Sequence, residues 1–265
     1  MIKLSVNINK VATIRNSRGG TKPSVLDAAR VCVEAGAPGI TVHPRADQRH
    51  ITAVDVRELS GFLQSVNASA PVAFDPVRPK PDATTARAVE YNIEGDPRPD
   101  LLALVHEVRP TQCTLVPVRP GEITSQAGWL ADTARDFIGR VVRELRDAGI
   151  RVSLFVDPEL PPIRWAADLG TDRVELYTEP FARAFEHGPS DGRQSFDRYA
   201  RAATEGHALG LGLNAGHDLD LENLVLFRSL PYLEEVSIGH ALISDALFVG
   251  HERSVRDFLD LLARR

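Results

Sequence analysis

The chain has 265 residues, 43% of them hydrophobic, which is enough apolar material for one large core or two smaller ones. Its formal net charge of −5 and its pI near 5.9 argue against nucleic acid as a main partner. No apolar run approaches the ~18 residues that span a bilayer, and no signal peptide precedes the first strand-like segment, so we expect a cytoplasmic protein without a membrane partner.

Eight short apolar segments follow one another along the chain and predict β-strands. They are Lys3–Ile8, Gly39–His43, Val89–Glu94, Gln112–Val116, Arg151–Val156, Arg173–Leu176, Leu211–Asn214 and Glu234–Ile238. The segments between them predict helices, for example Ser24–Glu34, Ala131–Ala148 and Phe196–Leu209.

A glycine recurs where a helix gives way to a strand. Gly36, Gly149, Gly170 and Gly210 each stand at such a junction, where glycine can take the left-handed conformation that ends a helix. Helix connections of this kind imply parallel strands, and eight such units in ~250 residues match a closed barrel. We therefore predict an α/β fold, a (β/α)8 TIM barrel that forms one domain over residues 1–265. A doubly wound open sheet is the main alternative, disfavoured because no Gly-x-Gly-x-x-Gly motif follows the first strand.

Two segments interrupt this rhythm. Residues 67–87 contain Pro71, Pro76, Pro79 and Pro81 and predict an inserted loop before the third strand. Residues 179–193 are rich in glycine, proline and charge and predict a second loop, after the sixth strand.

The active site of such a barrel lies at the carboxyl ends of its strands. Here these ends carry many acid–base, amide and cationic groups: Asn7, Asn9, Lys10, Arg15 and Arg18 for the first strand, His43, Arg45, Arg49 and His50 for the second, Glu94 for the third, Glu122 and Thr124 for the fourth, Glu175 for the sixth, His217 and Asp218 for the seventh, and Gly239 and His240 for the eighth.

These residue types suit proton transfer on a phosphorylated substrate. Imidazole changes charge near neutral pH, and a buried carboxyl such as Glu94 or Glu175 has a raised pKa unless an arginine offsets the burial. Guanidinium groups on the same rim bind phosphate well. The glycines after the last two strands, Gly216 and Gly239, also suit a phosphate site, because a helix predicted from Ala241 would point its N-terminus there.

The residues alone leave other functions open. Lys10 is the only one of four lysines placed at a strand end near these groups, so a Schiff-base aldolase is one alternative. A metal-dependent isomerase or hydrolase could use His43, His217, His240 and Glu175, although no His-x-His or His-Glu-x-x-His spacing occurs. A phosphate-binding protein without catalysis would have no use for the two carboxylates. Cys32 and Cys113 lack metal-ligand spacing and predict buried free thiols.

Several runs together resemble the pyridoxine 5′-phosphate synthase family. They are Val6–Gly19, Gly39–Arg45, Arg49–Ile51, Tyr91–Glu94, Leu115–Pro117, Val152–Phe155, Asn214–His217 and Ile238–Ala241, in the same order and over nearly the whole chain. The resemblance implies a (β/α)8 barrel with additional helices, assembled as a homo-octamer built from dimers. It implies an enzyme that condenses 3-amino-2-oxopropyl phosphate with 1-deoxy-D-xylulose 5-phosphate into pyridoxine 5′-phosphate, phosphate and water, without a metal or organic cofactor.

The resemblance also implies roles for individual residues. His43 and Glu94 would be proton acceptors, His217 a proton donor, and Glu175 would stabilise the transition state. The two substrates would be held by Asn7, Arg18, Arg45, His50, Thr124, Asp218, Gly239 and His240.

Two positions depart from the family pattern. The family more often has Asp-His where this chain has Asn9 and Lys10, so a histidine contact cannot be carried over and Lys10 is expected to supply positive charge instead. Asp218 stands where some members have glycine, so only its backbone contact is implied. The proline-rich insertion has no assigned counterpart.

Overall fold

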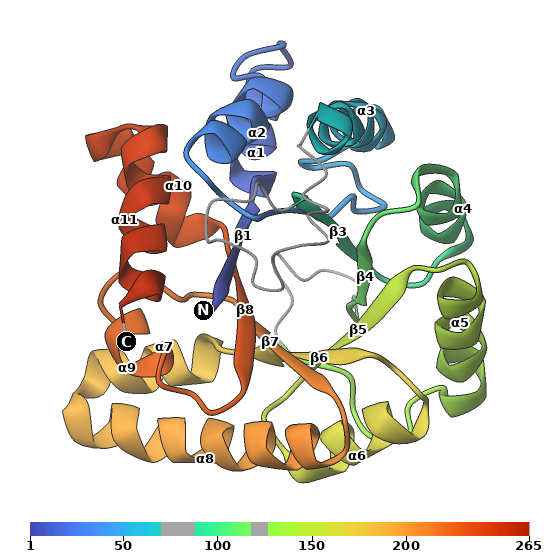
Figure 1. Cartoon of the computed structure of the whole chain (residues 1–265), viewed down its shortest axis with the longest axis vertical. Coiled ribbons are helices and arrows are strands. Elements are labelled where there is room, and N and C mark those ends of the chain that lie inside the picture. The colour runs from blue at the N-terminus through green and yellow to red at the C-terminus, as the bar shows by residue number, and fades with distance from the viewer. Residues whose placement is uncertain (70–87, 118–126, 265) are drawn as a thin grey trace, which may run out of the picture.

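A computed structural model describes residues 1–69, 88–117 and 127–264. Its eight strands pair in parallel, each with the next along the chain and the last with the first, and close into a barrel surrounded by helices (Figure 1). The strands are β1 (Lys3–Asn7), β2 (Gly39–Val42), β3 (Glu90–Gly95), β4 (Gln112–Leu115), β5 (Arg151–Val156), β6 (Arg173–Tyr177), β7 (Gly212–Gly216) and β8 (Leu233–Ile238). The predicted (β/α)8 TIM barrel is confirmed, with each strand within two residues of its expected bounds.

The described helices are more numerous than eight units require. They are α1 (Asn9–Asn16), α2 (Val25–Glu34), α3 (Ala53–Ser69), α4 (Pro99–Val108), α5 (Arg135–Asp147), α6 (Leu160–Asp168), α7 (Glu179–His187), α8 (Pro189–Ala208), α9 (Leu224–Phe227), α10 (His240–Val249) and α11 (His251–Ala263). Because α3 runs through Ser69, the first three residues of the predicted insertion are helical, and residues 70–87 lie outside the described residues.

The prediction of a loop over residues 179–193 is wrong, because α7 and the start of α8 occupy these residues. The prolines Pro180 and Pro189 lie in the first turn of each helix, where the missing N–H costs nothing. Gly188, at φ 138°, separates the two helices. Phe181 of α7 is fully buried, with its ring centroid 4.9 Å from that of Phe227, so aromatic packing holds α7 against α9.

The four junction glycines behave as predicted. Gly36, Gly149, Gly170 and Gly210 have φ between 76° and 100°, a left-handed conformation that residues with a Cβ adopt at a cost. Each turns the chain from a helix directly into the next strand.

The strands have an apolar and a polar side. Alternate residues such as Leu4 and Val6 are fully buried in the hydrophobic core. The residues between them hydrogen-bond across neighbouring strands: the hydroxyls of Ser5 and Thr41 lie 2.6 Å apart, and the amide of Asn92 donates to Thr41 at 3.3 Å. Barrels of this type more often fill the interior with branched apolar side chains. Here polar side chains occupy part of the interior, and the polar residues at the carboxyl ends of the strands continue them.

Charged residues occupy the amino-terminal end of the same interior. Glu90 pairs with Lys3 and with Arg151, and Arg173 pairs with Glu234 at 2.7 Å. These cations lie at the end of the barrel remote from the predicted site, because they stand at the first residues of their strands. Both cysteines are buried and free, as predicted. Among the described residues, no helix combines the length and apolar character needed to cross a membrane.

Candidate active site

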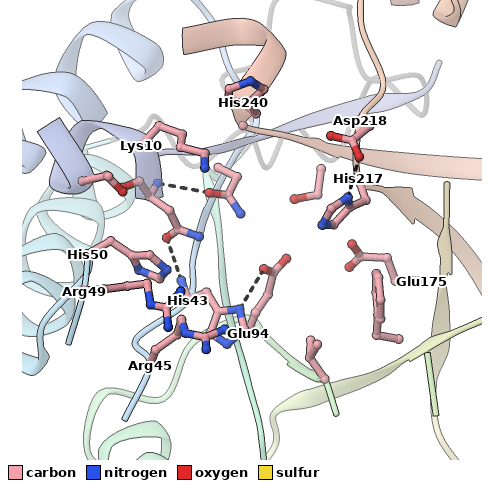
Figure 2. Close-up of a pocket in the computed structure, with 17 residues that line it drawn as sticks. Lys10, His43, Arg45, Arg49, His50, Glu94, Glu175, His217, Asp218 and His240 are labelled. Carbon is pink, nitrogen blue, oxygen red and sulfur yellow. Dashed lines mark hydrogen bonds and ion pairs between the residues drawn. The ribbon is translucent and has the colours of Figure 1, made fainter. Parts of the chain in front are cut away.

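A cavity of about 420 Å³ opens at the carboxyl ends of the strands. It brings together ten of the twelve residues predicted to act on or bind substrate: Asn7, His43, Arg45, His50, Glu94, Glu175, His217, Asp218, Gly239 and His240. Figure 2 shows His43, Arg45 and His50 on one side of the cavity and Glu175, His217 and Asp218 on the other. Side chains from opposite ends of the sequence therefore share one space.

Two predicted residues are not placed in this cavity. Arg18 lies in an exposed turn after α1 and does not contribute to the cavity wall. Thr124 lies outside the described residues. The predicted roles of both stay predictions.

The cavity wall also contains residues that the sequence analysis did not single out. Ser237 and Phe155 stand on β8 and β5 two residues beyond Glu235 and Ser153, which are buried polar residues of the barrel interior. Val116 and Thr13 complete the wall. Counting every second residue along each predicted strand would have found Ser237 and Phe155, since successive side chains alternate between faces.

A short hydrogen-bond chain positions His43. The backbone N–H of Asn9 donates to the side-chain oxygen of Asn7 at 3.1 Å, and the backbone N–H of His43 donates to the side-chain oxygen of Asn9 at 2.9 Å (Figure 2). The amide at position 9 therefore fastens the end of β2 to the start of α1. Its neighbour Lys10 extends into the same cavity.

Burial and neighbouring positive charge keep two imidazoles neutral. Burial, followed by the charges of His50 and Arg45, lowers the pKa of His43 to about 3. Burial, followed by the charge of Arg45, lowers the pKa of His50 to about 4. Both rings are therefore uncharged at neutral pH and can accept a proton.

Glu94 lies next to His43 but does not form a charged pair with it. The carboxyl Oε2 of Glu94 is 3.9 Å from Nδ1 of His43, longer than a hydrogen bond. Burial, together with the charge of Glu235 in the barrel interior, raises the pKa of Glu94 to about 8, against a weaker effect of a hydrogen bond from Ser237. With the pKa of His43 lowered and that of Glu94 raised, a neutral imidazole lies beside a protonated carboxyl at neutral pH.

Glu175 is the second buried carboxyl of the cavity. Burial raises its pKa well above the usual value, and the nearby carboxyls of Glu94 and Glu235 add to that effect. It is only 4% exposed and faces Gly216 on the neighbouring strand, where a methyl group would overlap its Oε1. The glycine at position 216 thus provides room for this carboxyl rather than only a turn.

His217 and Asp218 form a pair opposite His43. Nδ1 of His217 lies 3.0 Å from Oδ2 of Asp218 (Figure 2). The hydrogen bond from His217 lowers the pKa of Asp218, so the carboxylate is ionised at neutral pH. The ring of Tyr177 stands edge-on to the imidazole, with ring centroids 5.2 Å apart.

The helix predicted after the eighth strand begins at the cavity. Gly239 is the N-cap residue of α10, and His240 is its first residue. A Cβ at Gly239 would lie 3.0 Å from the carbonyl oxygen of Asn7, so any other residue there would push the turn and β1 slightly apart. The free N–H groups and the dipole of this helix N-terminus favour an anion.

Among the described residues, no three histidine, cysteine, aspartate or glutamate side chains lie close enough together to hold a metal ion. The cavity contains proton-transfer groups, arginines, a lysine and the N-terminus of α10.

Comparison with solved structures places the fold among other TIM barrels. The 3-hexulose-6-phosphate synthase from Salmonella typhimurium superposes with a TM-score of 0.61, over 98% of both chains, at 13% sequence identity. At that identity the likeness concerns the fold alone.

Sequence comparison is more specific. The family model described as "Pyridoxal phosphate biosynthesis protein PdxJ" matches residues 4–264. The pyridoxine 5′-phosphate synthase of Christiangramia forsetii is 49% identical over 263 residues, and that of Porphyromonas gingivalis 47% over 266, each over 99% of this chain and 100% of the relative. The resemblance noted in the sequence is thus confirmed, and the chain belongs to the PdxJ family of pyridoxal phosphate biosynthesis proteins.

Proposed function

We propose that the protein condenses 3-amino-2-oxopropyl phosphate with 1-deoxy-D-xylulose 5-phosphate to give pyridoxine 5′-phosphate, phosphate and water. The observation that carries this proposal is the pair of opposed acid–base groups in one cavity, His43 with Glu94 on one side and His217 with Glu175 on the other. Joining an amine to a ketone, closing a ring and aromatising it need repeated proton transfers at neighbouring atoms. Several weak acids and bases around one cavity can serve these successive steps.

In this proposal His43 is the first proton acceptor. Its ring is uncharged at neutral pH, and none of the described residues hydrogen-bonds its Nε2. Glu94, with a pKa of about 8, carries a proton at pH 7 in most molecules. Glu94 therefore accepts a proton in the smaller fraction of molecules in which it is ionised. It can also accept one after it has given its proton to the substrate in an earlier step. A pKa near the working pH allows either direction of transfer.

On the other side, His217 is the proton donor and Glu175 stabilises the transition state. The ionised Asp218 beside His217 favours the protonated imidazolium that a donor requires. Glu175, which burial keeps protonated, can donate a hydrogen bond to an oxygen that gains negative charge in the reaction.

The substrate phosphates would be held by the cations and by the helix N-terminus. Arg45 and His50 stand on one side of the cavity, while Gly239 and His240 begin α10 on another. The amide of Asn7 and the backbone of Asp218 would orient the carbon chains. Lys10 adds a charge between the two groups, at a position where the family more often has histidine.

The direct test is to mix the purified protein with both phosphates and follow pyridoxine 5′-phosphate by its absorbance, with mass spectrometry to identify the product. Omission of either substrate should abolish the signal. A protein that is folded, binds both phosphates and forms no pyridoxine 5′-phosphate would refute the proposal.

Lys10 keeps one alternative open, because its amine lies in the same cavity. If the enzyme formed a Schiff base with a keto phosphate, borohydride would attach the substrate to Lys10 and inactivate the protein. In the proposed reaction the imine forms between the two substrates, so Lys10 should remain unmodified.

We further propose that the protein acts in the cytoplasm as a homo-octamer built from dimers. The end of α10 presents Leu247, Phe248 and Val249 to solvent, with Phe248 90% exposed, and a second copy could cover this apolar patch. Light scattering at micromolar concentration would measure the mass, and a monomer would contradict the octamer.

A further inference from the structure

The pair formed by His217 and Asp218 gives the imidazole a defined orientation. Its Nδ1 is engaged by the carboxylate at 3.0 Å, which leaves Nε2 as the nitrogen available to the cavity (Figure 2). A carboxylate on one ring nitrogen fixes the tautomer and supports the charged ring. Asp218 is thus placed to act on His217 through its side chain, beyond any contact of its backbone with substrate.

The turn that carries the pair is held in an uncommon conformation. His217 has φ 95° and Asp218 has φ 58°, both in the left-handed region that favours glycine. Two hydrogen bonds from other segments hold it there: the hydroxyl of Thr178 donates to the carbonyl of His217, and the amide of Asn223 donates to the carbonyl of Asp218 at 3.0 Å. Anchored backbone at both residues keeps the imidazole and the carboxylate in register.

We infer that Asp218 is a positioning residue, whose carboxylate holds the Nδ1–H of His217 so that Nε2 faces the substrate, and stabilises the imidazolium before it gives up its proton. The part of this inference that concerns proton donation rests on the proposed function. The part that concerns the orientation and charge of His217 rests on the geometry alone.

Other groups around the pair affect the same proton. On β6, Glu175 lines the cavity and Tyr177 packs against the imidazole ring. His240 of α10 and Arg183 of α7 act on the carboxylate of Asp218, and both favour its ionised form. Asp218 contacts a ring nitrogen of His217 directly, so its removal should change the titration of His217 strongly.

The experiment measures the titration of His217 in the full-length protein without substrate. Deuterium exchange at histidine C2, followed by digestion and mass spectrometry, gives the pH midpoint of each histidine separately. In Asp218→Asn, a shape-matched side chain without charge, the midpoint of His217 should fall by about 1 pH unit or more, because an ionised partner at this distance is lost. Asp218→Glu should restore much of the shift.

A matched control removes a charge from the same segment without touching the imidazole. Glu222 is exposed, four residues beyond Asp218, and Glu222→Gln should leave the midpoint of His217 unchanged. If Asp218→Asn does not fold, Asp218→Gly replaces it, since glycine adopts φ 58° freely and also lacks the carboxylate. An unchanged midpoint in a folded Asp218 variant would overturn the inference.

The role in turnover is read from the pH dependence of kcat. If His217 donates a proton, the alkaline limb of the pH profile of kcat should move to lower pH in Asp218→Asn. The limb should move by the same amount as the titration midpoint of His217. In a His217→Gln background, Asp218→Asn should cause no further loss of kcat. A shifted midpoint with an unshifted limb would refute the catalytic part. A shifted midpoint in a protein that makes no pyridoxine 5′-phosphate would refute the proposed reaction and leave the positioning role standing.

Discussion

Because Gly216 lies close to Glu175, a substitution at position 216 can displace the carboxyl of Glu175 while residue 175 stays a glutamate. In Gly216→Ala the new methyl group would overlap Oε1 of Glu175 and lie 3.2 Å from the carbonyl oxygen of Ser237. The backbone of β8 cannot easily yield, so the carboxyl must retreat by about 1 Å to reach an ordinary van der Waals separation. A displacement of about 1 Å in a catalytic group can cost about 10²-fold in rate.

We therefore expect Gly216→Ala to lower kcat by about 10- to 10²-fold while the protein stays folded. The crowding should also lower the unfolding free energy by about 1–3 kcal/mol, as for other small-to-large changes in packed sites. Steady-state kinetics of pyridoxine 5′-phosphate formation would give kcat, and urea denaturation followed by circular dichroism would give the unfolding free energy.

The matched control is the same substitution with Glu175 already shortened. In Glu175→Ala the methyl group at position 216 no longer meets a carboxyl, so adding Gly216→Ala should reduce kcat little further. If Gly216→Ala keeps full activity, or reduces kcat equally with and without Glu175, the placement of that carboxyl does not limit the reaction and the argument fails.

Other changes test the remaining parts of the site and fold. His43→Ala should reduce turnover by about 10²- to 10⁴-fold with an unchanged circular dichroism spectrum; undiminished turnover would remove His43 from the mechanism. Arg45→Ala should weaken binding of a phosphorylated substrate by about 1.5–3 kcal/mol, measured by calorimetry, and an unaltered Kd would contradict its phosphate role. Because burial raises the pKa of Glu94 from 4.5 to about 8, the folded protein keeps a proton that the unfolded chain releases, and the resulting stability grows as the pH falls from 8 towards 4.5. The unfolding free energy of the wild type should thus gain about 2 kcal/mol over Glu94→Gln between pH 7 and pH 5; no pH-dependent difference would mean that Glu94 titrates normally. Gly61→Ala, in the exposed side of α3 with no atom near the added methyl, should raise the unfolding free energy by about 0.5–1 kcal/mol and leave kcat unchanged; a loss of stability there would contradict the open surroundings of this glycine.

Local patterns were sufficient to predict the barrel. Short apolar strands and the junction glycines, of which Gly36 is one, depend on interactions within a few residues, and each was found at its expected place. The loop expected at residues 179–193 failed for a local reason as well. That prediction rests on the glycine, proline and charge content of the segment, but Pro180 and Pro189 each lie in the first turn of a helix, where proline is favourable.

The members of the site were also accessible from the sequence, because strand ends of a barrel converge on one rim. Ten of the predicted residues share the cavity for that reason. Arg18 does not, since it lies in a turn after a helix rather than at the end of a strand.

Order along the chain thus determined the fold class and which polar groups gather at the barrel mouth, because strand periodicity and turn chemistry act over short distances. Only the tertiary structure decided how those groups affect one another. Burial and the charge of Glu235 on the last strand raise the pKa of Glu94 on the third, Gly216 makes room for Glu175, and the turn after β7 brings the carboxylate of Asp218 to His217. The first effect depends on distance across the closed barrel, the second on the pairing of β6 with β7, and the third on the left-handed conformation of one turn.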